Sequence, residues 1–294
     1  MKYIEKHPMI MIVIGVIGIS LSSIFVKYSQ APSAVTAAFR LLWTVLLMSP
    51  VALGKKEIRA QFRQMNRNEI FLSALSGFFL AMHFWLWFES LMHTSVASST
   101  AIVCTEVIWV SLGFCLFMKG RLTKKAVTAI AVTFIGSLLI AYSDSVSEGS
   151  GLYGDILALL AAVAVAVYTL IGRKIRENVS TTVYTYVVYA VCAFTLVIIC
   201  LLGKQELFSY GISAPIVGLL LAVFSTILGH SIFSWCLKYF SPSFVSASKL
   251  MEPVVAAILA VFLFSEMPAL VQIIGGLLII GGVLYYSRIE KAAN

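Results

Sequence analysis

The sequence predicts an all-α, polytopic membrane protein of ten transmembrane helices, folded as two inverted five-helix repeats. Three observations predict this fold. Of the 294 residues, 60% are apolar and only 12% are charged, whereas a typical soluble domain is nearly half apolar and about a quarter charged. The apolar residues form ten stretches long enough to cross a bilayer. The second half of the chain also repeats the first.

Each of the ten stretches has roughly the 20 predominantly apolar residues that a helix needs to cross the hydrocarbon core. The stretches begin near Met9, Pro32, Ile70, Ser95, Lys124, Leu152, Ser180, Ser213, Ser241 and Pro268. They leave no segment long enough for a separate soluble domain. All five cysteines fall inside them without a metal-ligand spacing, so we expect no metal and no other cofactor.

The net charge of +8 is explained by the loops that carry it and does not indicate a nucleic-acid partner. Most lysines and arginines fall in alternate joints of the ten-helix pattern, in residues 2–6, 55–67, 119–125, 173–176, 238 and 288–291. Basic loops stay on the cytoplasmic side of a membrane. We therefore expect a multi-pass protein of the cell membrane with both termini in the cytoplasm.

A shift of 146 residues superposes the second half of the chain on the first without a gap. It places Glu106 on Glu252 and Gly136 on Gly282. The repeats are predicted to span residues 1–146 and 147–294. Each holds five stretches, an odd number, so the second must enter the membrane from the opposite side. Inverted repeats are typical of secondary transporters, whose binding site lies near the midplane between the repeats.

Glu106 and Glu252 lie almost halfway along the fourth and ninth stretches. Charged groups in a span are costly and commonly mark function. Lys249 lies three residues before Glu252 on the same helical face, where the two charges can neutralise each other. Pro253 removes a backbone donor, so we expect a hinge beside this pair. The alternative is a structural ion pair that locks the helices together.

The third stretch carries His83 and Trp87 four residues apart on one face. With Trp109, one turn beyond Glu106, these rings could line an aromatic pocket. Aromatic stripes in membrane helices also pack or lie at interfaces, which is the competing interpretation. Glu89 lies near the outer end of this stretch and could reach interfacial water.

Two further polar residues fall inside spans. Arg40, in the second stretch, could bind an anionic group, form a structural pair or extend its guanidinium toward the surface. His230, in the eighth, lies one position from the repeat partner of His83 and could line the other half of the cavity or be a buried structural histidine. Glycines in the fifth and tenth stretches suit close helix packing; they are Gly136, Gly275, Gly276, Gly281 and Gly282.

The chain resembles the EamA-type permeases of the drug/metabolite transporter superfamily along essentially its whole length. The resemblance rests on Arg40 in AAFRLL and on the segments FESLMHTSVASSTAIVCTE, YGDILALLAAVAVAVYTLIGRK and MEPVVAAILAVFLFSEMPALVQIIGGLLIIGG. It implies a ten-helix carrier whose cavity is lined by the first, third, fourth, sixth, eighth and ninth helices, with the fifth and tenth behind. Val107 stands where the ninth helix has Pro253, which leaves the fourth helix without a kinking proline.

The leading hypothesis is an alternating-access secondary transporter, an exporter of a small zwitterionic or amphipathic metabolite such as an amino acid. Glu106, Glu252 or Glu89 would hold an ammonium group or a coupling proton, and Lys249 or Arg40 a carboxylate. The alternative is proton-coupled efflux of drugs or cationic compounds. An intramembrane enzyme is disfavoured because the chain has no HExxH or GxSxG motif. A non-transporting scaffold would not explain the midspan charges. We expect the protein to act in the lipid bilayer as a monomer or a homodimer.

Overall fold

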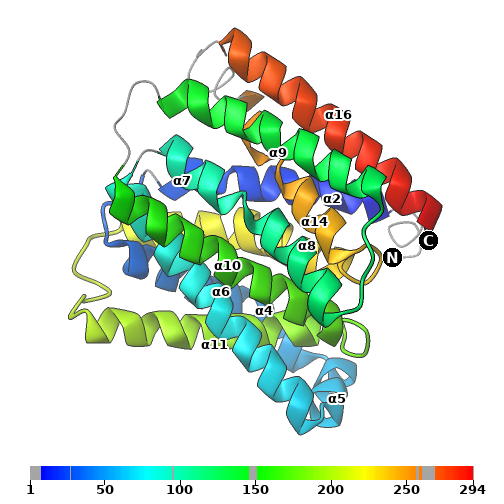
Figure 1. Ribbon diagram of the computed structural model, residues 1–294. Helices are drawn as coiled ribbons and strands as arrows, with labels where there is room; N and C mark the ends of the chain where they lie inside the picture. Colours follow the sequence, from blue (N-terminus) through cyan, green and yellow to red (C-terminus); the bar gives the residue numbers. More distant parts are fainter. Residues whose placement is uncertain are drawn as a thin grey trace.

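The computed structural model describes residues 8–26, 28–94, 96–145, 151–255, 258–259 and 269–293, and over these the chain is helical without strands (Figure 1). Ser95 and Pro268, where two predicted stretches begin, lie outside these residues. The first half contains α2 (Pro8–Ser20), α3 (Ser22–Val26), α4 (Ser33–Gly54), α5 (Lys56–Gln64), α6 (Arg67–His93), α7 (Val96–Val103), α8 (Glu106–Phe117) and α9 (Lys124–Ser145). The second half contains α10 (Leu152–Ile175), α11 (Thr181–Leu202), α12 (Ser213–Leu220), the π-helix η1 (Leu221–His230), α13 (Ser231–Cys236), α14 (Pro242–Lys249) and α16 (Leu270–Ala293).

Eight helical segments of the described chain are long and apolar enough to cross a membrane. They are Pro8–Val26, Ser33–Gly54, Arg67–His93, Ser99–Phe117, Leu152–Ile175, Thr181–Leu202, Ser213–Cys236 and Leu270–Glu290. The protein is thus a polytopic, all-helical membrane protein. The eight do not include α9 or the stretch from Ser241, which runs into undescribed residues. Ten helices remain a prediction.

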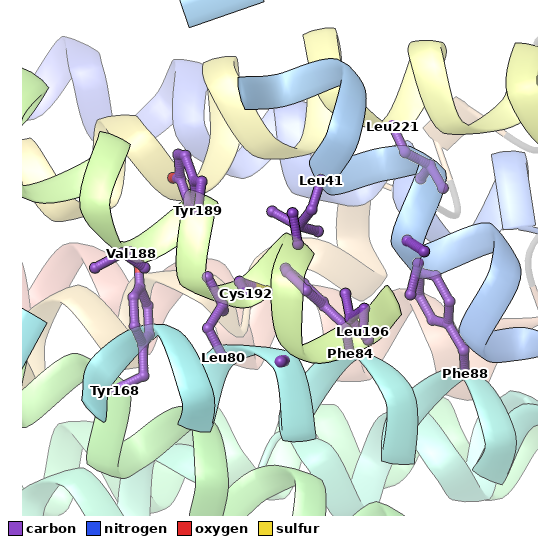
Figure 2. Packing of buried hydrophobic residues seen from close by; sticks show 14 of the residues in the cluster. Leu41, Leu80, Phe84, Phe88, Tyr168, Val188, Tyr189, Cys192, Leu196 and Leu221 are labelled. Atoms are coloured by element: carbon purple, nitrogen blue, oxygen red, sulfur yellow. The ribbon is translucent and has the colours of Figure 1, made fainter. Parts of the chain in front are cut away.

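The helices pack in antiparallel and crossing pairs that bury a continuous interior. Helix α6 lies along α10, and α4 lies along α11. Between them is the largest apolar cluster, which includes Leu41, Leu80, Phe84, Val188 and Leu196 (Figure 2). A second cluster joins α2, α13, α14 and the end of α16. Many large apolar side chains remain exposed, as expected where lipid is the solvent.

Helices α9 and α16 run side by side at one edge of the molecule (Figure 1). Small residues let their backbones approach closely. A Cβ atom added at Gly275 would lie 2.7 Å from the carbonyl oxygen of Gly136, and one added at Gly282 would meet the hydroxyl of Thr133. Gly281 faces open space, and Gly276 has only ordinary contacts. Three of the five predicted glycines thus lie in this contact.

Two helices are interrupted at positions related by the 146-residue shift. Helix α7 ends at Val103, and α8 begins at Glu106 after a turn at Cys104 and Thr105. Helix α14 ends at Lys249, and helix resumes at Glu252 after a turn at residues 250–251. In both turns a backbone N–H donates to the carbonyl oxygen three residues earlier. Thr105 N lies 3.0 Å from Ile102 O, and Met251 N lies 3.2 Å from Ser248 O. The first break forms without a proline.

The π-helix η1 (Leu221–His230) was not predicted from the sequence. Two backbone carbonyl groups in its wider turns accept hydrogen bonds from side chains five residues later. Thr226 Oγ1 donates to Leu221 O at 3.2 Å, and Ser231 Oγ donates to Thr226 O at 3.2 Å. Such widened turns are frequent at functional sites. Here the π-helix ends at His230, directly beside the pocket described next.

Candidate functional site

A pocket lies in the middle of the helix bundle, where the two apolar clusters meet. It encloses about 640 Å³ of space not filled by atoms, part of which is open to solvent. Its lining residues are Ile19, Ser22, Arg40, His83, Trp87, Thr100, Val103, Cys104, Glu106, Val165, His230, Ser246, Lys249, Leu250 and Glu252. Helices α9 and α16 contribute none of them. The lining residues therefore come from the six helices that the family resemblance implies and, in addition, from α4, which contributes Arg40.

The interruptions of the two helices bring Glu106 and Lys249 together. Lys249 Nζ lies 2.7 Å from Glu106 Oε1, and both side chains are largely buried. The same oxygen accepts hydrogen bonds from Ser246 Oγ at 2.9 Å and from Thr169 Oγ1 at 3.4 Å. Charge-assisted bonds of this length are among the strongest in proteins. One oxygen of Glu106 thus accepts three hydrogen bonds, one of them from a cation.

This pairing corrects the expectation that Lys249 neutralises Glu252. The expectation assumed one continuous helix, in which residues three apart share a face. The turn at residues 250–251 separates Lys249, the last residue of α14, from Glu252, which opens the next helical segment. Helix α14 packs against α8, so Lys249 reaches across to Glu106 instead.

Glu252 lies in the pocket without an ion pair or hydrogen bond to any residue that the structure describes. It is within electrostatic range of Lys249, Glu106 and Arg40. The two glutamates occupy equivalent positions in the sequence repeat, yet their surroundings differ. Glu106 is held by three donors, whereas Glu252 has no such donor among the described residues.

Arg40 points into the molecule and does not extend toward the surface, since only 1% of it is exposed. Its Nε donates to Thr226 Oγ1 at 2.8 Å, and its Nη1 donates to Ser22 Oγ at 3.3 Å. The guanidinium carbon lies 4.0 Å from the centre of the Phe84 ring. Its Nη2 has no hydrogen-bond partner among the described residues.

The rings of His83, Trp87 and His230 gather on one side of the pocket. His83 and Trp87 are stacked, with centroids 6.0 Å apart and planes 11° apart, and His230 lies 6.3 Å from His83. His83 Nδ1 is 3.0 Å from the carbonyl oxygen of Ala161. A carbonyl only accepts, so Nδ1 carries the proton and Nε2 is an acceptor in the neutral ring.

Two predicted residues do not line the pocket, and a third borders it. Glu89 pairs with His93 at 3.3 Å, and both side chains are partly exposed. Trp109 donates from Nε1 to Thr105 Oγ1 at 3.2 Å and is 36% exposed. Pro253 directly follows Glu252 and is half-buried.

Several polar residues that line the pocket were not predicted from the sequence, among them Ser22, Thr100, Cys104 and Ser246. Short hydroxyl side chains are common in helices, so composition did not distinguish them. The repeat could have done so, because the 146-residue shift places Thr100 on Ser246, and both line the pocket. A hydroxyl on each half, six residues before the paired glutamates, was a usable signal.

Comparisons with known proteins agree with this architecture. The model of the EamA-like transporter family matches residues 7–142 and again residues 152–288. An uncharacterized transporter of Clostridium kluyveri is 25% identical over 95% of this chain and 94% of its own length. The pseudopaline exporter CntI of Pseudomonas aeruginosa is 25% identical over 82% of this chain and 84% of its own.

A solved crystal structure shares the fold, with a TM-score of 0.80 and 14% identity over 98% of this chain and 99% of that one. The two family matches together cover nearly all of the sequence, and the pocket lies among helices of both matched segments. The chain therefore belongs to the EamA-like transporter family and is a multi-pass membrane transporter.

Proposed function

We propose that the protein exports a small zwitterionic metabolite, such as an amino acid, across the cell membrane. The observation that carries this proposal is the charge of the pocket. Two cations, Arg40 and Lys249, and two carboxylates, Glu106 and Glu252, line it together. Lys249 and Glu106 pair with each other, which leaves Arg40 and Glu252 for a ligand.

This arrangement favours a ligand that carries both signs of charge. With neutral histidines, the four charged side chains sum to zero, and a zwitterion keeps that balance when it enters. A ligand with a single charge would leave one protein charge uncompensated in a partly enclosed pocket, which is unfavourable. The stacked rings of His83 and Trp87 offer an apolar surface to the rest of the molecule.

Alternating access is the mechanism that suits two inverted repeats. In such carriers, interrupted helices of each repeat meet at the site. The shift of 146 residues carries α7 onto α14 and the first interruption onto the second. We therefore propose ten spans in two inverted repeats, residues 1–146 and 147–294, with Pro253 as a hinge. The basic loops favour cytoplasmic termini.

Export is supported by the relative named as a pseudopaline exporter. A proton is a natural coupling ion for this pocket, because removal from water favours the neutral form of a carboxyl group. Glu252 is the group that could exchange it, since Glu106 is engaged with Lys249. Substrate and proton would then compete for Glu252.

The test is a thermal-shift screen of the purified protein against amino acids, quaternary amines and nucleosides, followed by flux into liposomes with the best hit. We expect an amino acid to stabilise the protein and to be transported. Val165→Phe, which places a ring in the pocket lining, should abolish flux. Val163→Phe on the outer face of the same helix is the matched control.

Three outcomes would contradict the proposal. Binding and flux confined to quaternary amines would favour efflux of cationic compounds. Absence of flux for every compound, with intact folding, would favour a non-transporting scaffold. Conversion of a bound compound to a product by the purified protein would indicate an enzyme.

A further inference from the structure

We propose that Arg40, Trp87 and His230 form a subsite for the carboxylate of the substrate, and that Glu252 holds its ammonium group. This assignment rests on the proposed function and gives each end of the zwitterion a place. The carrying observation is that three residues on three helices line one pocket, and that each of them has a buried nitrogen atom without a hydrogen-bond partner among the described residues. These atoms are Arg40 Nη2, Trp87 Nε1 and His230 Nδ1.

The first component is the guanidinium of Arg40. It has five N–H groups in a planar fork that matches a carboxylate, and only Nε and Nη1 are engaged, by hydroxyl groups. No carboxylate of the described residues lies within ion-pair distance of it. A buried cation without a close counter-ion is unfavourable. An incoming carboxylate supplies that counter-ion and an acceptor for Nη2.

The second component is the pair of ring nitrogens. The indole Nε1 of Trp87 can only donate, so it requires an acceptor. The Nδ1 of His230 donates in one of the two neutral tautomers. These atoms are buried, and no described residue accepts a hydrogen bond from them. A conformation of the pocket that admits a carboxylate provides the missing acceptors.

Phe84 holds this subsite together. The guanidinium of Arg40 lies over its ring at 4.0 Å, and the ring of His230 meets it edge to face with centroids 5.1 Å apart. Trp87 is fixed from α6 by stacking on His83. The three nitrogens therefore come from α4, α6 and the end of η1, and one buried aromatic side chain contacts two of the three residues. Figure 2 shows Phe84 within this packed interior.

The same contacts exclude the competing assignments. Lys249 is already neutralised by Glu106 at 2.7 Å, so it is not the free cation. Glu106 accepts three hydrogen bonds, and Glu89 pairs with His93 outside the pocket. Glu252 is the lining carboxylate without such partners in the described chain. Because a carboxylate attracts an ammonium group, we assign the ammonium site to Glu252.

The experiment uses matched sets of ligands on the purified, full-length protein. Each set contains an amino acid, its amide, which lacks the carboxylate, and its deaminated acid, which lacks the ammonium group. We would use leucine with leucinamide and 4-methylpentanoate, and the corresponding sets for phenylalanine and glutamine. Affinities come from thermal shifts and from inhibition of liposome flux.

Arg40→Gln should weaken binding of the amino acid by about 10- to 100-fold, the effect of losing hydrogen bonds to a charged group. It should leave the amide almost unaffected, so the preference for acid over amide disappears. Arg40→Lys keeps the charge without the fork and should restore part of that preference. Glu252→Gln should instead remove the preference for the amino acid over its deaminated form.

Arg176→Gln is the matched control, because Arg176 is also a buried arginine but donates to backbone carbonyls outside the pocket. It should change neither preference. If wild-type protein binds an amino acid and Arg40→Gln and Arg40→Lys both keep its acid-over-amide preference, the subsite is wrong and the proposed function stands. If only amides bind wild-type protein, or no member of any set binds, both proposals are overturned.

Discussion

Lys249 Nζ and Glu106 Oε1 lie 2.7 Å apart and join the two halves of the chain at the pocket. Lys249 is the last residue before the interruption after α14, and Glu106 is the first residue after the interruption before α8. The ion pair therefore ties together the two places where the spanning helices are broken. A change in their separation would alter both halves at once.

Breaking this pair should destabilise the protein more than replacing it. Glu106→Gln leaves Lys249 buried without its carboxylate, which we expect to cost about 3 kcal/mol of unfolding free energy, as for other buried pairs. The double variant Glu106→Gln with Lys249→Met removes both charges and should recover much of that loss. Thermal unfolding of the four proteins in detergent measures the coupling. Additive losses would mean that the two charges do not stabilise each other.

The contact between α9 and α16 depends on Gly275. A methyl group at this position would lie 2.7 Å from the carbonyl oxygen of Gly136, so Gly275→Ala should separate the helices and lower stability by about 1 to 3 kcal/mol. Gly281→Ala, on the same helix with nothing within 4 Å, should be neutral or slightly stabilising, because alanine favours the helix. Thermal unfolding in detergent compares the two. Equal effects of both changes would show that the glycines matter only through helix propensity.

Trp87 offers a donor to the pocket that the described protein does not use. Trp87→Phe keeps an aromatic ring beside His83 but removes Nε1–H, so substrate affinity should fall about 2- to 10-fold, the contribution of one hydrogen bond. Trp85→Phe on the same helix, outside the pocket lining, is the control for loss of an indole. Thermal shifts with the transported amino acid measure both. An unchanged affinity in Trp87→Phe would remove Trp87 from the binding site.

Much of the site could be predicted because ionisable residues inside an apolar span have few alternatives to a shared interior. Seven of the nine predicted binding residues line the pocket, and Glu89 and Trp109 do not. Those two lie where their helices face outward, and helix position alone did not distinguish them from lining residues. The midspan positions of Glu106 and Glu252 and the aromatic face of His83 and Trp87 were visible in the spacing.

The pairing inside the pocket could not be predicted from spacing. Lys249 and Glu252 share a face only in a continuous helix, and the turn at residues 250–251 changes that face. The equivalent turn at Cys104 and Thr105 has no nearby proline from which it could have been predicted. The π-helix that ends at His230 packs closely against α2, where a Cβ atom at Gly18 would lie 2.7 Å from Phe224 O. Such features are set by tertiary contacts.

Glu252 should carry any dependence of transport on pH. It is the pocket carboxylate without an ion pair among the described residues, whereas Glu106 is engaged by Lys249. If protons drive export, Glu252→Gln should remove the pH dependence of flux in liposomes. Glu106→Gln should lower the amount of stable protein but keep the pH dependence of the remainder. Flux that is independent of pH in the wild type would eliminate proton coupling. Retained dependence in Glu252→Gln would assign the proton elsewhere.

Pro253 should act on the rate of transport and not on binding. Proline has no N–H, so it cannot donate to the carbonyl of Lys249 as a helical residue would. Pro253→Ala restores that donor beside the interruption at residues 250–251, and the segment should become a more regular and more stable helix. We expect unchanged or higher thermal stability, amino-acid affinity within about twofold of wild type because no pocket hydrogen bond is lost, and slower flux. Val107→Ala, at the equivalent position of the first half, removes no proline; it should lower stability because Val107 is buried, but leave the flux per folded protein unaltered. Equal flux in Pro253→Ala and wild type would show that this proline is not a hinge.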